Sequence, residues 1–252
     1  MKNKGFAKTK KEIKLMKKSG DICAKALKKV LESVKPGVTL EELDTIAKEE
    51  IERYGATSSF MTVEDYKHTI CTTVNDQVVH GIPTHRALEQ GDILGIDIGA
   101  LYRGYHSDQA ISVPVGIVSK EDEKFLEIGE RTLNKAIGVA KVGNHIGDIS
   151  ATIQNGVESA GYSVVKSLTG HGVGKKLHED PMVPGFGKSG TGPKLEKDMT
   201  LAIEVIYTQG SGEVILEKDN WTISSEDGSL GGLFEKTIAI TKNGPIVLTP
   251  YL

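Results

Sequence analysis

The chain has 252 residues, a formal net charge of −3 and a hydrophobic share of 38%, which together are typical of a globular protein with a large core. No basic excess favours nucleic acid, and no apolar run is long enough to cross a membrane. The two cysteines exclude a disulfide framework and suit a reducing compartment, so we expect a cytoplasmic protein that binds neither DNA nor membranes.

The N-terminal segment is rich in lysine and continues into a predicted helix. Eight of the first eighteen residues are lysine, and the apolar core of a signal peptide is absent. Apolar residues then recur at helical spacing from Ile13 to Val34. We interpret the lysines as a solvated helix face, and a weak contact with ribosomes is left open.

A capping box predicts the start of a second helix. Thr39 is followed three residues later by Glu42, and the apolar positions after it keep helical spacing until Gly55. Residues 35–56 align without gaps with residues 141–162, which begin 106 positions later. The alignment matches the helix starts, the glycine stops and the apolar positions.

The repeat predicts two similar halves. Each copy follows a long amphipathic helix, the second of which begins at Ser119, and each copy precedes strand-like segments. We therefore expect halves of about 10–115 and 119–252, packed about an approximate two-fold axis into one domain over residues 1–252.

Two aspartates interrupt apolar, strand-like runs in ILGIDIGALYRGYHSDQAI, residues 93–111. At a period of two, Leu94, Ile96 and Ile98 share one face of the first run, and Asp97 lies on the other. An even-membered turn within LYRGY would place Asp97 directly opposite Asp108, roughly 5 Å away. Two carboxylates so close need a proton or a cation between them. A hairpin whose polar face is simply wet is the alternative.

Further acids and histidines extend this pattern. Glu204 and Glu235 also interrupt strand-like runs, His171 and then His178 lie in the loop SLTGHGVGKKLHEDP, and His80 closes another strand. A lone acid in a strand often faces water, and a lone histidine is more often structural than a ligand. Four carboxylates converging on one cavity, however, would carry a charge near −4, which burial makes very unfavourable.

Two divalent cations would offset this charge. Four acids and one imidazole suit Mn, Fe or Co and tolerate Zn or Mg better than a thiolate-selecting site would. A pair of ions about 3.5–4 Å apart can activate a shared water and polarise a carbonyl. We therefore expect the acids to be metal ligands.

Other motifs are excluded. GHGVGK lacks the spacing and the Ser/Thr of a phosphate-binding P-loop, and no GxSxG sequence supports a serine hydrolase. Cys71 has no activating base nearby in the sequence and is interpreted as a buried cysteine in a pocket wall.

In chain order, Asp97, Asp108, His171, Glu204 and Glu235 resemble the metal ligands of the type I methionine aminopeptidases, metallopeptidases with the pita-bread fold. The resemblance covers nearly the whole chain, and its most specific segments are CTTVNDQVVHGIP, GDILGIDIGALYRGYHSDQA, TGHGVGKKLHEDP and NWTISSEDGSLGGLFEKTIAIT. The last of these contains Trp221, which favours methionine aminopeptidase over other pita-bread enzymes. The resemblance implies an α+β fold in which a curved antiparallel sheet carries outer helices and consists of two pseudo-symmetric halves.

The resemblance also implies two divalent metal ions, Mn, Fe or Co, with Zn tolerated. Asp97 would bind one ion, His171 and Glu204 the other, and Asp108 and Glu235 both. Glu204 would also act as general base.

The remaining implied roles concern the substrate. His178 would stabilise the oxyanion, and His80 would contact the substrate near its N-terminal end. His178 would also contact the substrate, and the walls of the methionine pocket would be Tyr66, Cys71, Leu177 and Trp221.

The implied reaction is hydrolytic removal of the initiator methionine from nascent polypeptides or peptides whose second residue is small, by a monomer. One alternative is an Xaa-Pro-type peptidase of the same fold, which usually has a large extra N-terminal domain, whereas only about ninety residues precede Asp97 here. The other is a non-catalytic pita-bread binding protein, in which ligands should be missing.

Four positions depart from the usual family pattern. Leu177 replaces a common phenylalanine, Val205 a proline, Leu233 a glutamine and Lys236 a histidine. Such changes alter the surroundings of the ligands and put efficiency in doubt more than reaction type.

Overall fold

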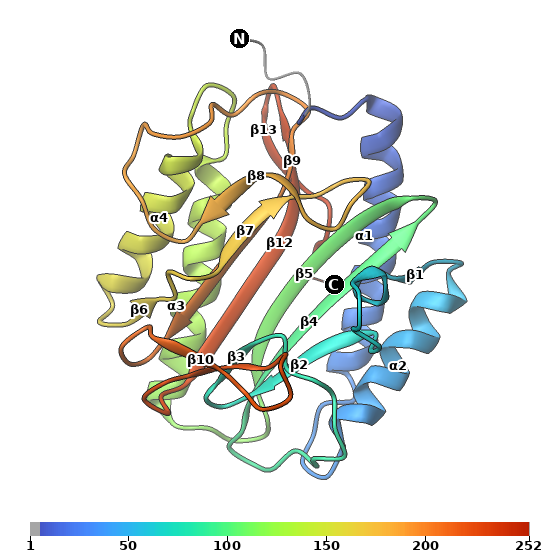
Figure 1. Cartoon of the computed structure of the whole chain (residues 1–252), viewed down its shortest axis with the longest axis vertical. Coiled ribbons are helices and arrows are strands. Elements are labelled where there is room, and N and C mark those ends of the chain that lie inside the picture. The colour runs from blue at the N-terminus through green and yellow to red at the C-terminus, as the bar shows by residue number, and fades with distance from the viewer. Residues whose placement is uncertain (1–5, 252) are drawn as a thin grey trace.

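The computed structural model describes residues 6–251 and places two pairs of helices behind one large sheet (Figure 1). Within those residues the α-helices are α1 (Lys10–Leu31), α2 (Leu40–Arg53), α3 (Lys120–Val139) and α4 (Ile146–Glu158), with one short 3-10 helix at Phe60–Thr62. No helix in this part of the chain has the length and apolar character needed to cross a membrane.

The helix starts follow from capping side chains. Thr39 and Glu42 form the predicted capping box of α2, and the helix predicted to begin at Ser119 is α3, which Ser119 caps. The helices of the repeat, α2 and α4, begin at Leu40 and Ile146, in the same register as the sequence alignment. Each of the two helices is preceded and followed by a glycine with positive φ: Gly37, Gly55, Gly143 and Gly161. A side chain would disfavour this conformation, which explains why glycine occurs at the same positions in both copies of the repeat.

The main sheet is antiparallel throughout, with a central strand order of β1-β4-β5-β12-β9-β7-β8. Its strands are β1 (Thr57–Ser58), β2 (Ile70–Val74), β4 (Ile93–Tyr102), β5 (Tyr105–Pro114), β6 (Ser163–Val164), β7 (Thr169–Gly172), β8 (Glu179–Pro184), β9 (Thr200–Thr208), β12 (Gly231–Thr241) and β13 (Gly244–Val247). A second, small sheet consists of β10 (Val214–Leu216), β11 (Ile223–Ser225) and β3 (Gln77–Val79).

The two halves repeat the same arrangement on either side of the sheet centre. Helix α1 packs behind β4 and β5 with α2 beside it against β1 and β2, and α3 packs behind β9 and β12 with α4 beside it against β6 and β8 (Figure 1). The predicted α+β pita-bread fold with pseudo-symmetric halves is therefore confirmed. The halves also interlock, because β3 of the first half pairs with β11 of the second. That residues 1–252 form a single domain stays a prediction.

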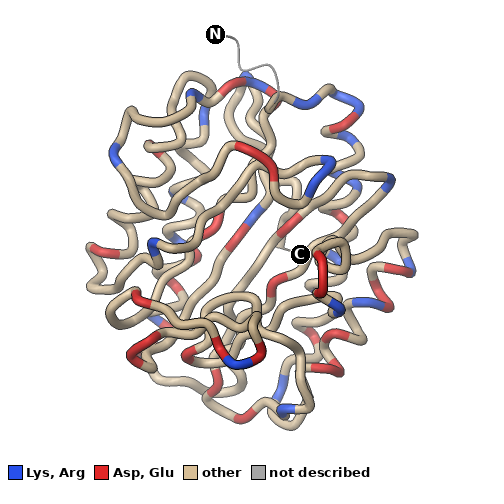
Figure 2. The backbone as a smooth tube through the Cα atoms, in the orientation of Figure 1, with Lys and Arg blue, Asp and Glu red and all other residues tan. Residues whose placement is uncertain are grey.

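The apolar face of β4 is the one predicted from its period of two. Leu94, Ile96 and Ile98 are fully buried in the cluster formed with α1 and α2, and Asp97 lies on the opposite face of the sheet. The lysines of α1 are exposed, as predicted, whereas Lys2 and Lys4 of the lysine-rich start lie outside the described residues. Figure 2 shows charged residues mainly on helices and loops, with acidic positions also on the central strands.

The predicted opposition of Asp97 and Asp108 is wrong. The hairpin turn is Arg103–Gly104, both with positive φ, and it pairs Tyr102 with Tyr105. This pairing sets Asp97 opposite Ala110 and Asp108 opposite Gly99. A two-residue turn of type I′ needs positive φ at both positions, which Gly104 accommodates easily. The turn centre therefore lies one residue later than direct opposition requires. The two aspartates are diagonal neighbours on one face.

Candidate active site

A cavity of about 330 Å³ lies on the sheet face away from the helices and is lined by every site residue that the sequence predicts. These are Tyr66, Cys71, His80, Asp97, Asp108, His171, Leu177, His178, Glu204, Trp221 and Glu235. The structure therefore brings together residues from two stretches of the chain, Tyr66 to Asp108 and His171 to Glu235.

Strand register explains how the five predicted ligands meet. One transverse row of the sheet runs from Asp97 in β4 through Ala110 in β5 to Glu235 in β12 and Glu204 in β9. The neighbouring row contains Asp108 in β5 and His171 in β7, which pairs with β9 at Ala202. Each of five strands thus supplies one side chain, and the five side chains occupy two successive rows on one face of the sheet.

Burial disfavours the ionised form of these four carboxyl groups unless a positive charge lies nearby. Removal from water raises the pKa of Asp97 to about 7, and burial together with the charge of Asp97 raises the pKa of Glu204 to about 8. The pKa values of Asp108 and Glu235 are also raised, first by burial and then by the neighbouring carboxylates. All four acids cannot be ionised together at neutral pH unless cations lie among them.

The donor set fits divalent metal ions. Three buried carboxylate oxygens have no hydrogen-bond partner among the described residues: Asp97 Oδ1, Asp108 Oδ1 and Glu235 Oε1. Potential ligand atoms of Asp108, His171 and Glu235 all lie within 4.8 Å of one another. Oxygen-rich sets with one imidazole suit Mn, Fe, Co or Zn.

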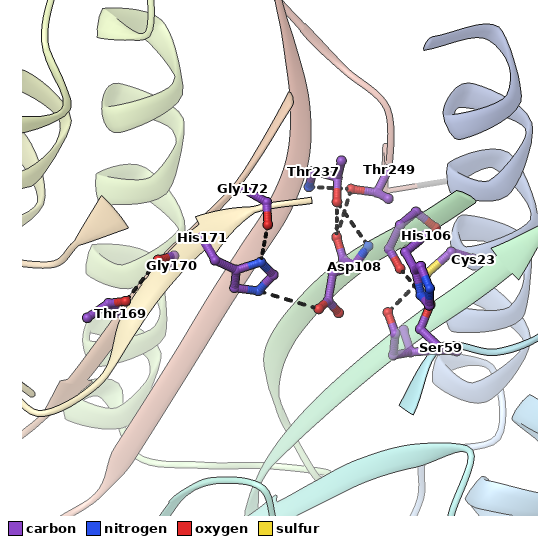
Figure 3. A network of polar contacts seen from close by, with 12 residues as sticks. Cys23, Ser59, His106, Asp108, Thr169, Gly170, His171, Gly172, Thr237 and Thr249 are labelled. Carbon is purple, nitrogen blue, oxygen red and sulfur yellow. Dashed lines mark hydrogen bonds and ion pairs between the residues drawn. The ribbon is translucent and has the colours of Figure 1, made fainter. Parts of the chain in front are cut away.

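His171 is oriented as a neutral ligand. Its Nδ1 lies 2.8 Å from the Gly172 carbonyl oxygen, which can only accept, so Nδ1 carries the proton (Figure 3). Its Nε2 then presents a lone pair and lies 3.8 Å from Asp108 Oδ2. Burial lowers the pKa of His171 to about 4, so the ring is neutral at pH 7. A hydrogen bond that fixes the tautomer in this way is the usual support of a metal-binding histidine.

The raised pKa values predict how the metal-depleted protein responds to pH. In the unfolded chain Asp97 and Glu204 lose their protons near pH 4, whereas in the folded chain they hold them to about pH 7 and 8. The folded state therefore binds more protons across this interval, and the free energy of unfolding should fall as the pH rises from about 4 to about 8. Urea unfolding after chelator treatment measures this, and added Mn²⁺ should restore stability at pH 8. A chelated protein equally stable at pH 5 and pH 8 would contradict the expectation.

Two further histidines line the cavity. The centroid of the His178 ring lies 4.5 Å from that of the His171 ring. His178 and His80 both remain exposed to solvent, but partial loss of water lowers the pKa of both, so that both are neutral at pH 7. The loop that carries His178 is fastened by Glu179, whose carboxylate accepts hydrogen bonds from Lys8 Nζ at 2.8 Å and from the backbone N–H of Lys176 at 3.0 Å.

One end of the cavity is apolar. Phe60, Tyr66, Cys71 and Leu177 form a buried cluster, with Trp221 packed against it. The ring centroids of Tyr66 and Trp221 are 5.0 Å apart, and the Tyr66 hydroxyl donates to the Ile70 carbonyl at 2.8 Å. Burial raises the pKa of the Cys71 thiol, so Cys71 is a wall residue and a poor nucleophile at neutral pH.

Sequence reasoning missed several residues of the site. The cavity is also lined by Phe60, Val63, Val79, Ser167, Leu168, Thr169, Met182 and Ile206. Most of them lie in short or irregular segments where no hydrophobic period can be read. Next to the cavity, buried His106 shares a hydrogen bond of 3.0 Å with Ser59 (Figure 3). The sequence HSD places His106 two residues before Asp108 on the same strand face, which was an available but weak indication.

The four departures from the family pattern lie in different surroundings. Val205 is packed in the core on the helix side of the sheet, and Lys236 is buried with its Nζ 3.0 Å from the centroid of the Tyr251 ring. Leu233 is buried in an apolar cluster with Ala110, and only Leu177 forms part of the cavity wall. Val205 and Lys236 therefore do not contact the cavity directly.

Comparisons with known proteins show the family to which the chain belongs. Residues 14–242 match the model of metallopeptidase family M24. The chain is 46% identical to the methionine aminopeptidase of Clostridium perfringens, over 96% of this chain and 97% of that one, and 44% identical to methionine aminopeptidase 1 of Bacillus subtilis, over 97% and 98%.

Solved structures show the same relationship. The crystal structure of methionine aminopeptidase from Thermotoga maritima is similar with a TM-score of 0.95 and 40% identity, covering 96% of this chain and 98% of that one. The prolidase from Pyrococcus horikoshii OT3 is similar with a TM-score of 0.80 and 26% identity, and the match covers 98% of this chain but only 64% of the prolidase. The chain therefore belongs to metallopeptidase family M24 and, within it, to the methionine aminopeptidases.

Proposed function

We propose that the protein is a dinuclear metal-dependent aminopeptidase that hydrolyses the peptide bond after an N-terminal methionine when the second residue is small. The observation that carries this proposal is the convergence of five potential ligands, two neutral histidines and an apolar recess on one cavity. Methionine aminopeptidase relatives that match nearly the whole chain support the same reaction.

The proposed metal centre uses all five ligands. Asp97 would hold one ion, His171 and Glu204 the other, and Asp108 and Glu235 both, with Mn, Fe or Co as the preferred ions and Zn tolerated. When bound, the ions supply an activated water and a polarised substrate carbonyl.

The remaining chemistry belongs to the chain itself. Glu204 would accept the proton of the attacking water as general base, a role that requires its carboxylate to be ionised. His178, neutral at pH 7, donates a hydrogen bond to the oxygen that becomes negative as the carbonyl is attacked. His80 contacts the substrate near its N-terminal end.

The proposed pocket reads the methionine side chain. An unbranched thioether can fill the recess between Tyr66, Cys71, Leu177 and Trp221, where aromatic edges favour contact with sulfur. The free amino terminus lies beside the acids, which selects chain ends. We propose further that the enzyme is a monomer and acts in the cytoplasm on nascent polypeptides or peptides. A weak contact with ribosomes through the lysine-rich N-terminus is left open.

A peptide panel tests the reaction. With Mn²⁺ or Co²⁺ present, Met-Ala-Ser should release methionine, and a matched Met-Lys-Ser peptide should react about 100-fold more slowly because its second side chain is large. Ala-Pro should be a poor substrate because it lacks the methionine side chain. Faster cleavage of Ala-Pro would favour the Xaa-Pro-type peptidase, and no cleavage with any of Mn²⁺, Fe²⁺, Co²⁺ and Zn²⁺ would favour the binding protein.

A further inference from the structure

The two halves of the sheet meet at an unusually short seam between β5 and β12. These strands pair at only two positions, Ala110 with Glu235 and Gln109 with Lys236, although β5 pairs with β4 at ten positions and β12 with β9 at nine. Strands β5 and β12 lie side by side in Figure 1. The seam matters because these strands contain Asp108 and Glu235, the two acids proposed to bind both ions.

A side-chain hydroxyl closes one end of this seam. Continuing the register by one pair places Thr237 opposite Asp108, but the two backbones do not pair. Instead, Thr237 Oγ1 accepts a hydrogen bond from the Asp108 N–H at 2.9 Å and donates one to the Asp108 carbonyl at 2.8 Å (Figure 3). The Thr237 N–H in turn donates to Thr249 Oγ1 at 2.9 Å. The hydroxyl therefore stands where a backbone partner would stand.

The opposite end of the seam has the same construction. Ser112 lies opposite Leu233 in the continued register, and its Oγ accepts from the Leu233 N–H at 3.0 Å and donates to the Leu233 carbonyl at 3.1 Å. Both hydroxyls are buried. A hydroxyl inserted between two strands holds them farther apart than a direct backbone pair, so these two side chains set the width of the seam at its ends.

Of the two hydroxyls, only that of Thr237 makes hydrogen bonds to the backbone of a proposed metal ligand. In an antiparallel strand the N–H and C=O of one residue point the same way, so both main-chain groups of Asp108 face β12 and are satisfied by Thr237. The Asp108 carboxylate itself has one oxygen without any partner among the described residues and another 3.8 Å from His171 Nε2. Its position therefore depends on the backbone that Thr237 holds.

We propose that Thr237 is a positioning residue whose hydroxyl fixes where the Asp108 carboxylate stands relative to Glu235 and His171, and thereby tunes metal binding. The proposal rests on the dinuclear centre proposed above. It assigns no chemical step to Thr237, which is fully buried and does not line the cavity. Ser112 is the matched case, since it makes the same pair of backbone contacts to a residue that is not a ligand.

The test compares Thr237→Val, Thr237→Ser and Ser112→Ala with the unmodified protein. Each full-length, metal-depleted protein is titrated with Co²⁺ and followed by calorimetry and by the visible absorption of the bound ion. Thr237→Val keeps the shape but not the hydroxyl, so its Co²⁺ affinity should fall about tenfold, the lower end of the effect of changing a group that supports a ligand. Its visible spectrum should change as well. Thr237→Ser, which keeps the hydroxyl, should retain the spectrum, and Ser112→Ala should bind within about twofold of the unmodified protein.

The outcomes separate this inference from the metal centre on which it rests. If the unmodified protein binds no Co²⁺ at the cluster, the metal centre is wrong and the inference is overturned with it. If the unmodified protein binds Co²⁺ and Thr237→Val binds it equally with the same spectrum, only the role of Thr237 is overturned. Equal losses in Thr237→Val and Ser112→Ala would also overturn that role, because they would reflect general loosening of the seam. Should Thr237→Val fail to fold, Thr249→Val, which removes the next hydroxyl of the chain, is expected to weaken Co²⁺ binding in the same direction, and unchanged binding would overturn the inference.

Discussion

Asp108→Asn should lower kcat/KM for Met-Ala-Ser by about a thousand-fold or more. The Asp108 carboxylate is proposed to bind both ions, and an amide offers only one neutral oxygen in its place. Metal ions stabilise developing charge by several kcal/mol, and each tenfold in rate corresponds to about 1.4 kcal/mol, so loss of the shared ligand accounts for an effect of this size. Steady-state kinetics at several Mn²⁺ concentrations measure it.

The same substitution should not destabilise the metal-depleted protein. Burial, and then the charges of Asp97 and Glu204, raise the pKa of Asp108, so an amide in its place adds no charge to the cluster and removes repulsion from it. The melting temperature of the metal-depleted variant should therefore equal or exceed that of the unmodified protein. Asp122→Asn at the start of α3 is the matched control, since it removes a capping carboxylate outside the cavity and should leave kcat/KM unchanged. Turnover of Asp108→Asn near that of the unmodified protein would refute the bridging role.

His178→Ala should lower kcat by about a hundred- to a thousand-fold while KM changes little. Removing one donor from an oxyanion-binding site has an effect of this size, because the hydrogen bond strengthens only as negative charge develops on the oxygen. His178 lies in the cavity beside His171 and is neutral at pH 7, so it can donate without first gaining a proton.

Two comparisons isolate this role of His178. Co²⁺ binding by His178→Ala should stay close to that of the unmodified protein, whereas His171→Ala should lose it, because only His171 is a proposed ligand. Leu177→Met, a change of similar volume at the adjacent wall position, should keep kcat within about threefold. A raised KM with an unchanged kcat in His178→Ala would assign His178 to ground-state substrate binding instead.

Local patterns in the sequence were sufficient to predict two helix starts and the face of one strand that carries a site residue. The capping residues Thr39 and Ser119 locate two helix starts, and the period of two in residues 93–99 places Asp97 on the face opposite the core. These features depend on neighbouring residues only, and the printed sequence contains them in full. The repeat of residues 35–56 at 141–162 also predicted that the chain forms two similar halves that pack against each other.

Features that depend on distant segments could not be predicted in the same way. The register of β4 against β5 depends on which two residues form the turn, and Arg103–Gly104 places it one residue later than expected. The alignment of Glu235 with Glu204 depends on the register in which β12 pairs with β9, and these two residues are 31 positions apart in the sequence. The convergence of the ligands was therefore inferred from charge and from family resemblance, and strand pairing supplies the geometry.

The seam hydroxyls show a second limit. Serine and threonine in a strand look alike in sequence whether they face water or replace a backbone partner, and nothing around Thr237 or Ser112 distinguishes the two cases. Likewise Phe60 and Met182 line the cavity from a short 3-10 helix and from β8, where no period indicates which way a side chain points.

The central claim is that acids and a histidine from five strands hold two ions in one cavity. Anomalous diffraction from crystals grown with Mn²⁺ tests it most directly. We expect two anomalous peaks about 3.5–4 Å apart, in contact with Asp97, Asp108, His171, Glu204 and Glu235. Crystals in which those five side chains contact no Mn²⁺ peak, although the ion is present in excess at neutral pH, would contradict the account.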